Sequence, residues 1–70
     1  MSKSAYNVIE LIGTSTTSWE DAAKTAIETA GKTLRELRIA EITKLDMKIE
    51  AGKVAAYRAR ITASFKYDPD

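Results

Sequence analysis

Carboxylates are the main candidate metal ligands in this sequence, because it contains no histidine and no cysteine. Aspartate and glutamate oxygens are ligands for hard cations such as Ca²⁺ and Mg²⁺. Seven candidate carboxylates are spread along the chain without the dense spacing of a calcium-binding loop: Glu10, Glu20, Asp21, Glu28, Glu41, Asp46 and Glu50. A cation site would therefore have to be assembled across a symmetry axis of an oligomer, and the sequence leaves the ligating residues unassigned.

The same missing residue types argue against catalysis. Without histidine or cysteine, the chain lacks the commonest general base and any thiol nucleophile. It also lacks a Ser-His-Asp set, a phosphate-binding P-loop and the glycine pattern of dinucleotide-binding folds. The sequence therefore predicts a protein that is not an enzyme.

Basic side chains offer a second kind of chemistry. Arg58, with Arg60 and Lys48, could hold an anion or a phosphate group, and the alternative is that Arg58 pairs with Glu41 or Asp46 across a sheet. Eleven Lys and Arg residues against ten Asp and Glu residues give a net charge of only +1. This balance argues against a nucleic-acid partner.

A group of hydroxyl side chains precedes a predicted helix, and a tryptophan lies at its start. The hydroxyl side chains of residues 14–18 lie where helix amides can bind phosphate, although capping and turn formation explain them adequately. Trp19, the only tryptophan, could be a ligand platform, but packing in a core or a subunit contact is the favoured interpretation.

The first half of the chain predicts a strand followed by a helix. Residues 5–12 are rich in β-branched and aromatic types and stop at Gly13. Thr17 and Glu20 have the spacing of a capping box that would start a helix over residues 18–35. One apolar stripe recurs at spacings of three and four: Trp19, Ala22, Ala23, Ala26, Ile27, Ala30 and Leu34.

The second half predicts two long strands joined by a hairpin turn at residues 50–53. Apolar and polar residues alternate strictly over residues 44–50 and again over residues 55–67. The alternation changes phase near Thr43, which indicates a bulge or a bend there. The expected fold class is α+β, with β-α-β-β order and a three-stranded antiparallel sheet wrapped around one helix.

Seventy residues allow a single domain, residues 1–70, with residues 68–70 as a frayed tail. A chain this short buries only about 60% of its unfolded surface, so a lone core is marginally stable. The strand from residue 37 to residue 50 should extend about 45 Å, whereas the helix reaches about 27 Å. Because one alanine-rich helix cannot cover that sheet, we expect an obligate homo-oligomer.

The chain closely resembles the dodecins over nearly its whole length. The matching residues are Val8-Ile9-Glu10-Leu11-Ile12-Gly13-Thr14-Ser15, Ser18-Trp19-Glu20-Asp21-Ala22-Ala23, Ala40-Glu41, Tyr57 and Ser64-Phe65. The resemblance implies a hollow homododecamer that stores or sequesters a small ligand, commonly riboflavin or FMN, without catalysis.

The resemblance also implies two flavin-binding positions, both of which are altered here. Ile39 stands where a tryptophan stacks on the flavin ring, and Arg58 stands where a glutamine binds its polar edge. Glu41 and Lys48 complete the expected pocket positions. Isoleucine cannot stack, and arginine has no acceptor, so flavin binding should be weak. The sequence resembles the branch that lacks this pair, some members of which bind calcium.

The ligand therefore stays open between a flavin and a divalent cation, calcium or magnesium. The alternative function is a structural or interaction oligomer with no specific small-molecule ligand. We expect the chain's partner to be itself. No apolar run is long enough to cross a bilayer, and the N-terminal residues lack a secretory signal, so we expect a cytoplasmic protein without a membrane partner.

Overall fold

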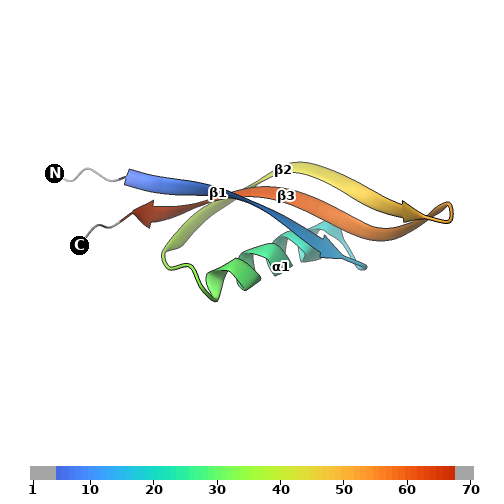
Figure 1. Ribbon diagram of the computed structural model, residues 1–70, viewed down its shortest axis with the longest axis horizontal. Coiled ribbons are helices and arrows are strands. Elements are labelled where there is room, and N and C mark those ends of the chain that lie inside the picture. The colour runs from blue at the N-terminus through green and yellow to red at the C-terminus, as the bar shows by residue number, and fades with distance from the viewer. Residues whose placement is uncertain (1–4, 68–70) are drawn as a thin grey trace.

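The computed structural model describes residues 5–67, which form three strands and one helix (Figure 1). The elements in chain order are β1 (Ala5–Ser15), α1 (Trp19–Gly31), β2 (Leu37–Glu50) and β3 (Lys53–Tyr67). The sheet has the order β1-β3-β2, and both pairings are antiparallel. The expected β-α-β-β order, with a three-stranded antiparallel sheet and one helix, is confirmed. The expected frayed tail at residues 68–70 lies outside the described residues.

The first strand is longer than its sequence pattern indicated. We expected it to stop at Gly13, but it continues to Ser15, and Gly13 pairs with Ala59 of the central strand, β3. A Cβ atom at Gly13 would lie 2.0 Å from the carbonyl oxygen of Ala22. The glycine therefore allows the backbone of α1 to approach the sheet closely, rather than ending the strand.

The helix is shorter than expected, and it begins differently. It spans Trp19–Gly31 rather than residues 18–35, so Leu34 and Arg35 belong to the connection that leads to β2. The expected capping box at Thr17 is wrong, because the hydroxyl of Ser18 accepts the Asp21 amide at 3.0 Å. Ser18 has the extended backbone that an N-cap requires, and its side chain satisfies one of the free amides of the first turn.

Small residues form the core between the helix and the sheet. The buried hydrophobic residues are Ala22 and Ala26 of α1 and Ala59, Ile61 and Ala63 of β3. Only Ile61 among them is large, so the core gains close contact but little buried apolar area. This agrees with the alanine-rich stripe and leaves the single chain short of hydrophobic stabilisation.

The phase change in the second strand is confirmed as a bulge. The register between β2 and β3 shifts between Ile42 and Lys44, and the Thr43 hydroxyl donates to the Arg60 carbonyl at 3.1 Å. The shift lets Ile42 and Leu45 lie on the same side of the sheet although they are three residues apart. It thereby keeps Ala40 and Ile42, before the bulge, and Leu45, after it, on the side of α1.

The hairpin between β2 and β3 turns at Ala51 and Gly52. Their φ angles are 51° and 75°, and positive φ at both central residues matches the twist of a two-residue hairpin. The predicted turn at residues 50–53 is confirmed. An unexpected shift beside it, between Lys48 and Ile49, brings Ile49 opposite Val54.

This hairpin extends well beyond the helix (Figure 1). The chain measures 55 × 20 × 14 Å, whereas a 13-residue helix is about 20 Å long. Apolar side chains toward the tip of the hairpin are exposed, namely Leu45, Met47, Ile49 and Val54. The single chain therefore presents an apolar surface that its own helix does not reach.

Candidate ligand-binding site

The sheet has two faces, which carry different chemistry. Residues directly opposite each other on paired strands share a face, so Ala59, Ile61 and Ala63 mark the face that packs on α1. We call the other side the outer face. Arg58, Arg60, Thr62 and Ser64 alternate with the core residues along β3, and they carry hydroxyl and charged groups on the outer face.

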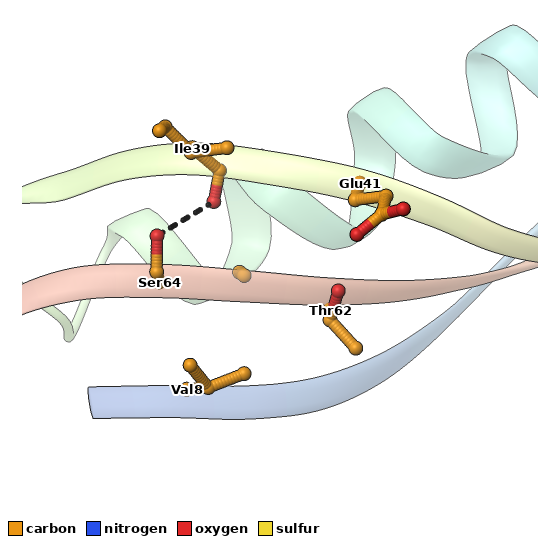
Figure 2. A pocket seen from close by; sticks show the side chains of 6 residues that line it. Val8, Ile39, Glu41, Thr62 and Ser64 are labelled. Carbon is orange, nitrogen blue, oxygen red and sulfur yellow. Dashed lines mark hydrogen bonds between the residues drawn. The ribbon is translucent and has the colours of Figure 1, made fainter. Parts of the chain in front are cut away.

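A shallow hollow of about 260 Å³ crosses all three strands on this side. Its lining residues are Val8 of β1, Ile39 and Glu41 of β2, and Thr62, Ala63 and Ser64 of β3 (Figure 2). Ser64 pairs with both Val8 and Ile39, and Thr62 pairs with Glu41. The strand register therefore gathers these side chains, which are far apart in the sequence.

The hollow combines apolar walls with oxygen acceptors. Val8 and Ile39 are 65% and 69% exposed, and the Ser64 hydroxyl donates to the Ile39 carbonyl at 3.4 Å. Among the described residues that line it, none is aromatic, and Glu41 supplies the only charged group. Such a lining offers a carboxylate and hydroxyls to a ligand, but no ring on which a flavin could stack.

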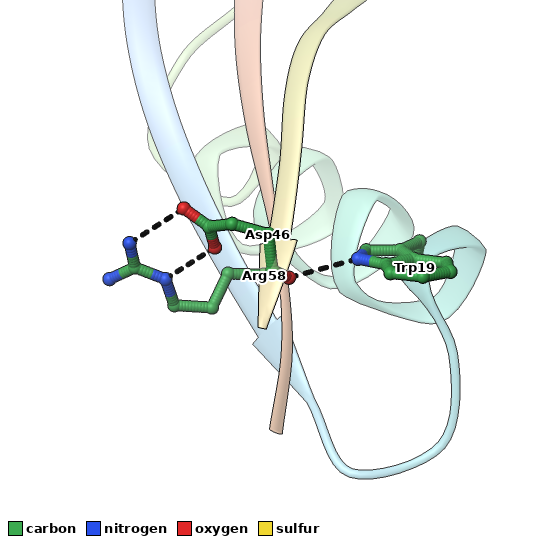
Figure 3. A network of polar contacts seen from close by, with 3 residues as sticks. All are labelled: Trp19, Asp46 and Arg58. Carbon is green, nitrogen blue, oxygen red and sulfur yellow. Dashed lines mark hydrogen bonds and ion pairs between the residues drawn. The ribbon is translucent and has the colours of Figure 1, made fainter. Parts of the chain in front are cut away.

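Arg58 lies away from this hollow and is already paired. Its Nε and Nη2 atoms donate to Asp46 Oδ1 and Oδ2 at 2.7 and 2.8 Å, a bidentate pair across β2 and β3 (Figure 3). The hydrogen bonds from Arg58 hold the pKa of Asp46 below its ordinary value, and the same bonds raise the pKa of Arg58. Of the two partners considered for Arg58, the structure selects Asp46 rather than Glu41.

Lys48 does not join Arg58. Its Nζ atom lies 3.2 Å from Glu50 Oε2, and both side chains are well exposed. The four expected pocket positions therefore fall into separate groups within one chain. Ile39 and Glu41 share the hollow, while Arg58 and Lys48 each pair with a neighbouring carboxylate.

Trp19 makes a contact that the sequence did not indicate. Its indole Nε1 donates to the carbonyl oxygen of Asp46 at 2.9 Å, and its ring meets Tyr57 edge-on, with centroids 5.0 Å apart. Figure 3 shows the indole and the Arg58 side chain on opposite sides of β2. Trp19 therefore connects the first turn of α1 to β2 through a hydrogen bond and to β3 through a ring contact. This agrees with the packing role that the sequence favoured.

The hydroxyl cluster before the helix serves capping. The Ser15 hydroxyl donates to Asp21 Oδ2 at 2.7 Å and accepts the Thr17 amide at 2.9 Å. Together with the Ser18 cap, these bonds use the hydroxyls to order the turn into α1. Capping, rather than a phosphate site, accounts for these contacts.

Within residues 5–67, no three acidic side chains lie close enough together to hold a metal ion. The same part of the chain has no helix long and apolar enough to cross a membrane. A cation site that used several carboxylates would need residues from more than one copy of the chain, as the spacing of the acidic residues indicated.

Sequence reasoning missed Val8, Thr62 and Ser64 as lining residues. The register would have found them, because residues opposite Ile39 and Glu41 on β3 must share their face. That inference requires the bulge at Thr43 to be placed first. The hydrogen bond from Trp19 to a backbone carbonyl leaves no signal in the sequence.

These features define a class of small α+β subunit, in which a long three-stranded sheet is half covered by one alanine-rich helix and carries its polar groups on the outer face. The family model for dodecin matches residues 5–68. Calcium dodecin of Mycobacterium tuberculosis is 39% identical over 66 residues, which cover 94% of this chain and 93% of that protein. The chain belongs to the dodecin family.

Solved structures agree with this assignment. Dodecin from Streptomyces coelicolor superposes with a TM-score of 0.93 at 33% identity, over 100% of both chains. A structure of the calcium dodecin from Mycobacterium tuberculosis, described as having a novel calcium-binding site, gives a TM-score of 0.83 at 40% identity, over 94% of each chain. The resemblance stated from the sequence is therefore confirmed.

Proposed function

We propose that this protein forms a non-catalytic homododecameric shell that binds and sequesters calcium rather than a flavin. The observation that carries the choice of ligand is the state of the two flavin-binding positions. Ile39 offers no ring, and the guanidinium of Arg58 is held by Asp46. The compartment we propose is the cytoplasm, which cell fractionation would test.

Flavin binding is disfavoured on energetic grounds. Loss of a stacked ring and of an amide contact should cost about 2–4 kcal/mol per site, or roughly thirty- to a thousand-fold in affinity. Arg58 cannot replace the amide, because a guanidinium has donors and no acceptor. Its pairing with Asp46 also reduces its attraction for other groups.

Calcium is supported by chemistry and by similarity. Oxygen ligands suit Ca²⁺, and Glu41 with the Thr62 and Ser64 hydroxyls places oxygens on an exposed surface. The relative from Mycobacterium tuberculosis is a calcium dodecin. We propose that carboxylates from several copies complete the site in the shell, as the acidic spacing requires.

Native mass spectrometry with and without calcium tests this proposal. We expect a twelve-subunit mass that increases by bound calcium, and a calorimetric titration should give saturable calcium binding. Magnesium serves as the matched cation, since it demands a stricter octahedral geometry. A stable shell that binds neither cation would instead favour the alternative, a structural or interaction oligomer.

A separate experiment tests the expectation that flavin binds weakly. Riboflavin fluorescence should be quenched weakly by the unchanged protein and strongly by the double variant Ile39→Trp, Arg58→Gln. We expect a gain of roughly thirty- to a thousand-fold, with each single variant between the two. Tight riboflavin binding by the unchanged protein would show that another part of the shell holds the ring and would refute the choice of calcium over flavin.

A further inference from the structure

Asp46 lies in the middle of a group of cations on the outer face. Along β2 it stands between Lys44 and Lys48, each two residues away and on the same face. Across the sheet it pairs with Arg58, and Arg60 follows in the next row opposite Lys44. We call Lys44, Lys48, Arg58 and Arg60 the cation group.

Pairing within the cation group is uneven. Arg58 donates two hydrogen bonds from its guanidinium to the Asp46 carboxylate, and Lys48 forms an ion pair with Glu50. Among residues 5–67, neither Lys44 nor Arg60 has an ion pair. The charge of Arg60 also contributes to lowering the pKa of Asp46. Two carboxylates, Asp46 and Glu50, thus pair with two of the four cations, in a chain whose total net charge is only +1.

The geometry of the Asp46–Arg58 pair resembles phosphate recognition. A guanidinium binds a carboxylate or a phosphate in the same way, through two parallel hydrogen bonds to two oxygens. Lysines beside it act as point charges that attract the same groups. Asp46 therefore occupies the donors that a phosphate group would use, and the remaining cations surround that position.

We propose that Asp46 is a specificity-determining residue. Its carboxylate takes up the hydrogen-bond donors of Arg58 and so prevents phosphate-bearing small ligands from binding to the cation group. This role rests on the proposed function, because it concerns which ligands the same shell excludes. A shell that takes up a metal cation would otherwise carry a strong phosphate site on the outer face of each sheet, and FMN would bind more tightly through its phosphate. Asp46 removes that advantage.

Binding of inorganic pyrophosphate to the assembled protein tests the proposal directly. Isothermal calorimetry gives the affinity, and the emission of Trp19 gives a second signal because its indole is bonded to the Asp46 carbonyl. We expect Asp46→Asn to bind pyrophosphate at least about tenfold more tightly than the unchanged protein. Added salt should reduce this gain.

Glu50→Gln is the matched control, because it changes the net charge by the same amount and frees Lys48 instead of Arg58. We expect it to raise pyrophosphate affinity by less than about threefold. The double variant Asp46→Asn, Arg58→Gln should lose the gain. An equal gain in Glu50→Gln, or no gain in Asp46→Asn, would overturn the proposal.

Asp46→Thr is the second variant, for use if the Asp46→Asn protein does not assemble. Threonine favours a strand and carries no charge. Circular dichroism and native mass spectrometry establish that each variant is folded and assembled. Calcium titration of the unchanged protein is independent of these results. An absence of calcium binding would refute the proposed function, whereas unchanged pyrophosphate binding in both Asp46 variants would refute only the role of Asp46.

Discussion

Asp46 joins three elements through two different groups. Its carboxylate pairs with Arg58 of β3 on the outer face, and its carbonyl accepts the indole of Trp19 from α1. The side-chain pair was one of two that the polar pattern of the sheet allowed, and the register decides between them. Because a backbone carbonyl has no residue-specific signal, the bond from Trp19 could not have been predicted.

The ion pair at Asp46 predicts a contribution to stability that depends on pH. Its pKa is lower in the folded chain than the ordinary value of 3.8, chiefly through the hydrogen bonds from Arg58. The folded state therefore gains stability at pH above that value and loses it as the pH falls through the lowered folded pKa. The urea midpoint of the unchanged protein should fall more between pH 6 and pH 3 than that of Asp46→Asn.

Both proteins contain the other carboxylates, so the difference between the two midpoints isolates Asp46. Both side chains of the pair are about half exposed, at 41% for Arg58 and 52% for Asp46. Solvent screening keeps such a contribution small. Parallel pH curves for the two proteins would contradict this assignment.

At the scale of elements, the contact between α1 and β1 depends on one glycine. The sequence indicated Gly13 correctly as a special position but attributed it to the end of a strand. The distinction depends on the helix backbone, which approaches Gly13 closely only after the chain has folded. Periodicity predicts which elements form and which faces they bury, but not how near two backbones come.

Replacing Gly13 by alanine should prevent normal folding or assembly. The new Cβ would lie 2.0 Å from the Ala22 carbonyl oxygen and 2.9 Å from the Ala26 Cβ, so the helix would have to move away from the sheet. Overpacking of this kind typically costs about 1–3 kcal/mol or more. Thermal unfolding and native mass spectrometry measure the loss.

Gly31→Ala is the control, because the nearest atom to its added Cβ is Leu37 Cδ1 at 3.9 Å, an ordinary contact. Alanine favours a helix relative to glycine, so this variant should be as stable as the unchanged protein or slightly more so. A Gly13→Ala protein with an unchanged melting temperature would contradict the close helix approach.

The start of the helix gives a second prediction at this scale. Ser18→Ala removes the acceptor of the Asp21 amide and should cost about 1 kcal/mol. Thr17→Ala should cost much less, because Ser18 rather than Thr17 is the N-cap. Urea unfolding of the two variants compares them, and a larger loss for Thr17→Ala would restore the capping box that the sequence suggested.

The whole molecule is a long sheet with too little helix to cover it. That the helix is shorter than the sheet was predictable from the expected lengths of the elements. The difference in length is larger than expected, because α1 is five residues shorter than predicted. What the single sequence could not indicate is which hairpin residues lie uncovered, since that depends on where the helix starts along the sheet. The exposed residues toward the tip of the hairpin, Leu45 and Met47 among them, follow from that placement.

A charge on this apolar surface should disrupt the oligomer. Leu45→Glu should dissociate the assembly and unfold the chain in one step, because burying an unpaired carboxylate is costly and the lone core is small. Lys24→Glu on the exposed side of α1 is the control and should leave the assembly intact. Sedimentation velocity measures both, and a folded single subunit of about 8 kDa in the Leu45→Glu protein would contradict the argument.

The order of strands in the sheet also determines when the fold can form during synthesis. The central strand, β3, is the last to be translated, and both β1 and β2 pair only with it. Ala5 therefore finds its partner, Tyr67, only when the end of β3 has been made. Neither earlier strand has any partner within this sheet before then. The sheet, with the burial of the apolar residues on β1 and β2, can therefore form only after β3 has been made.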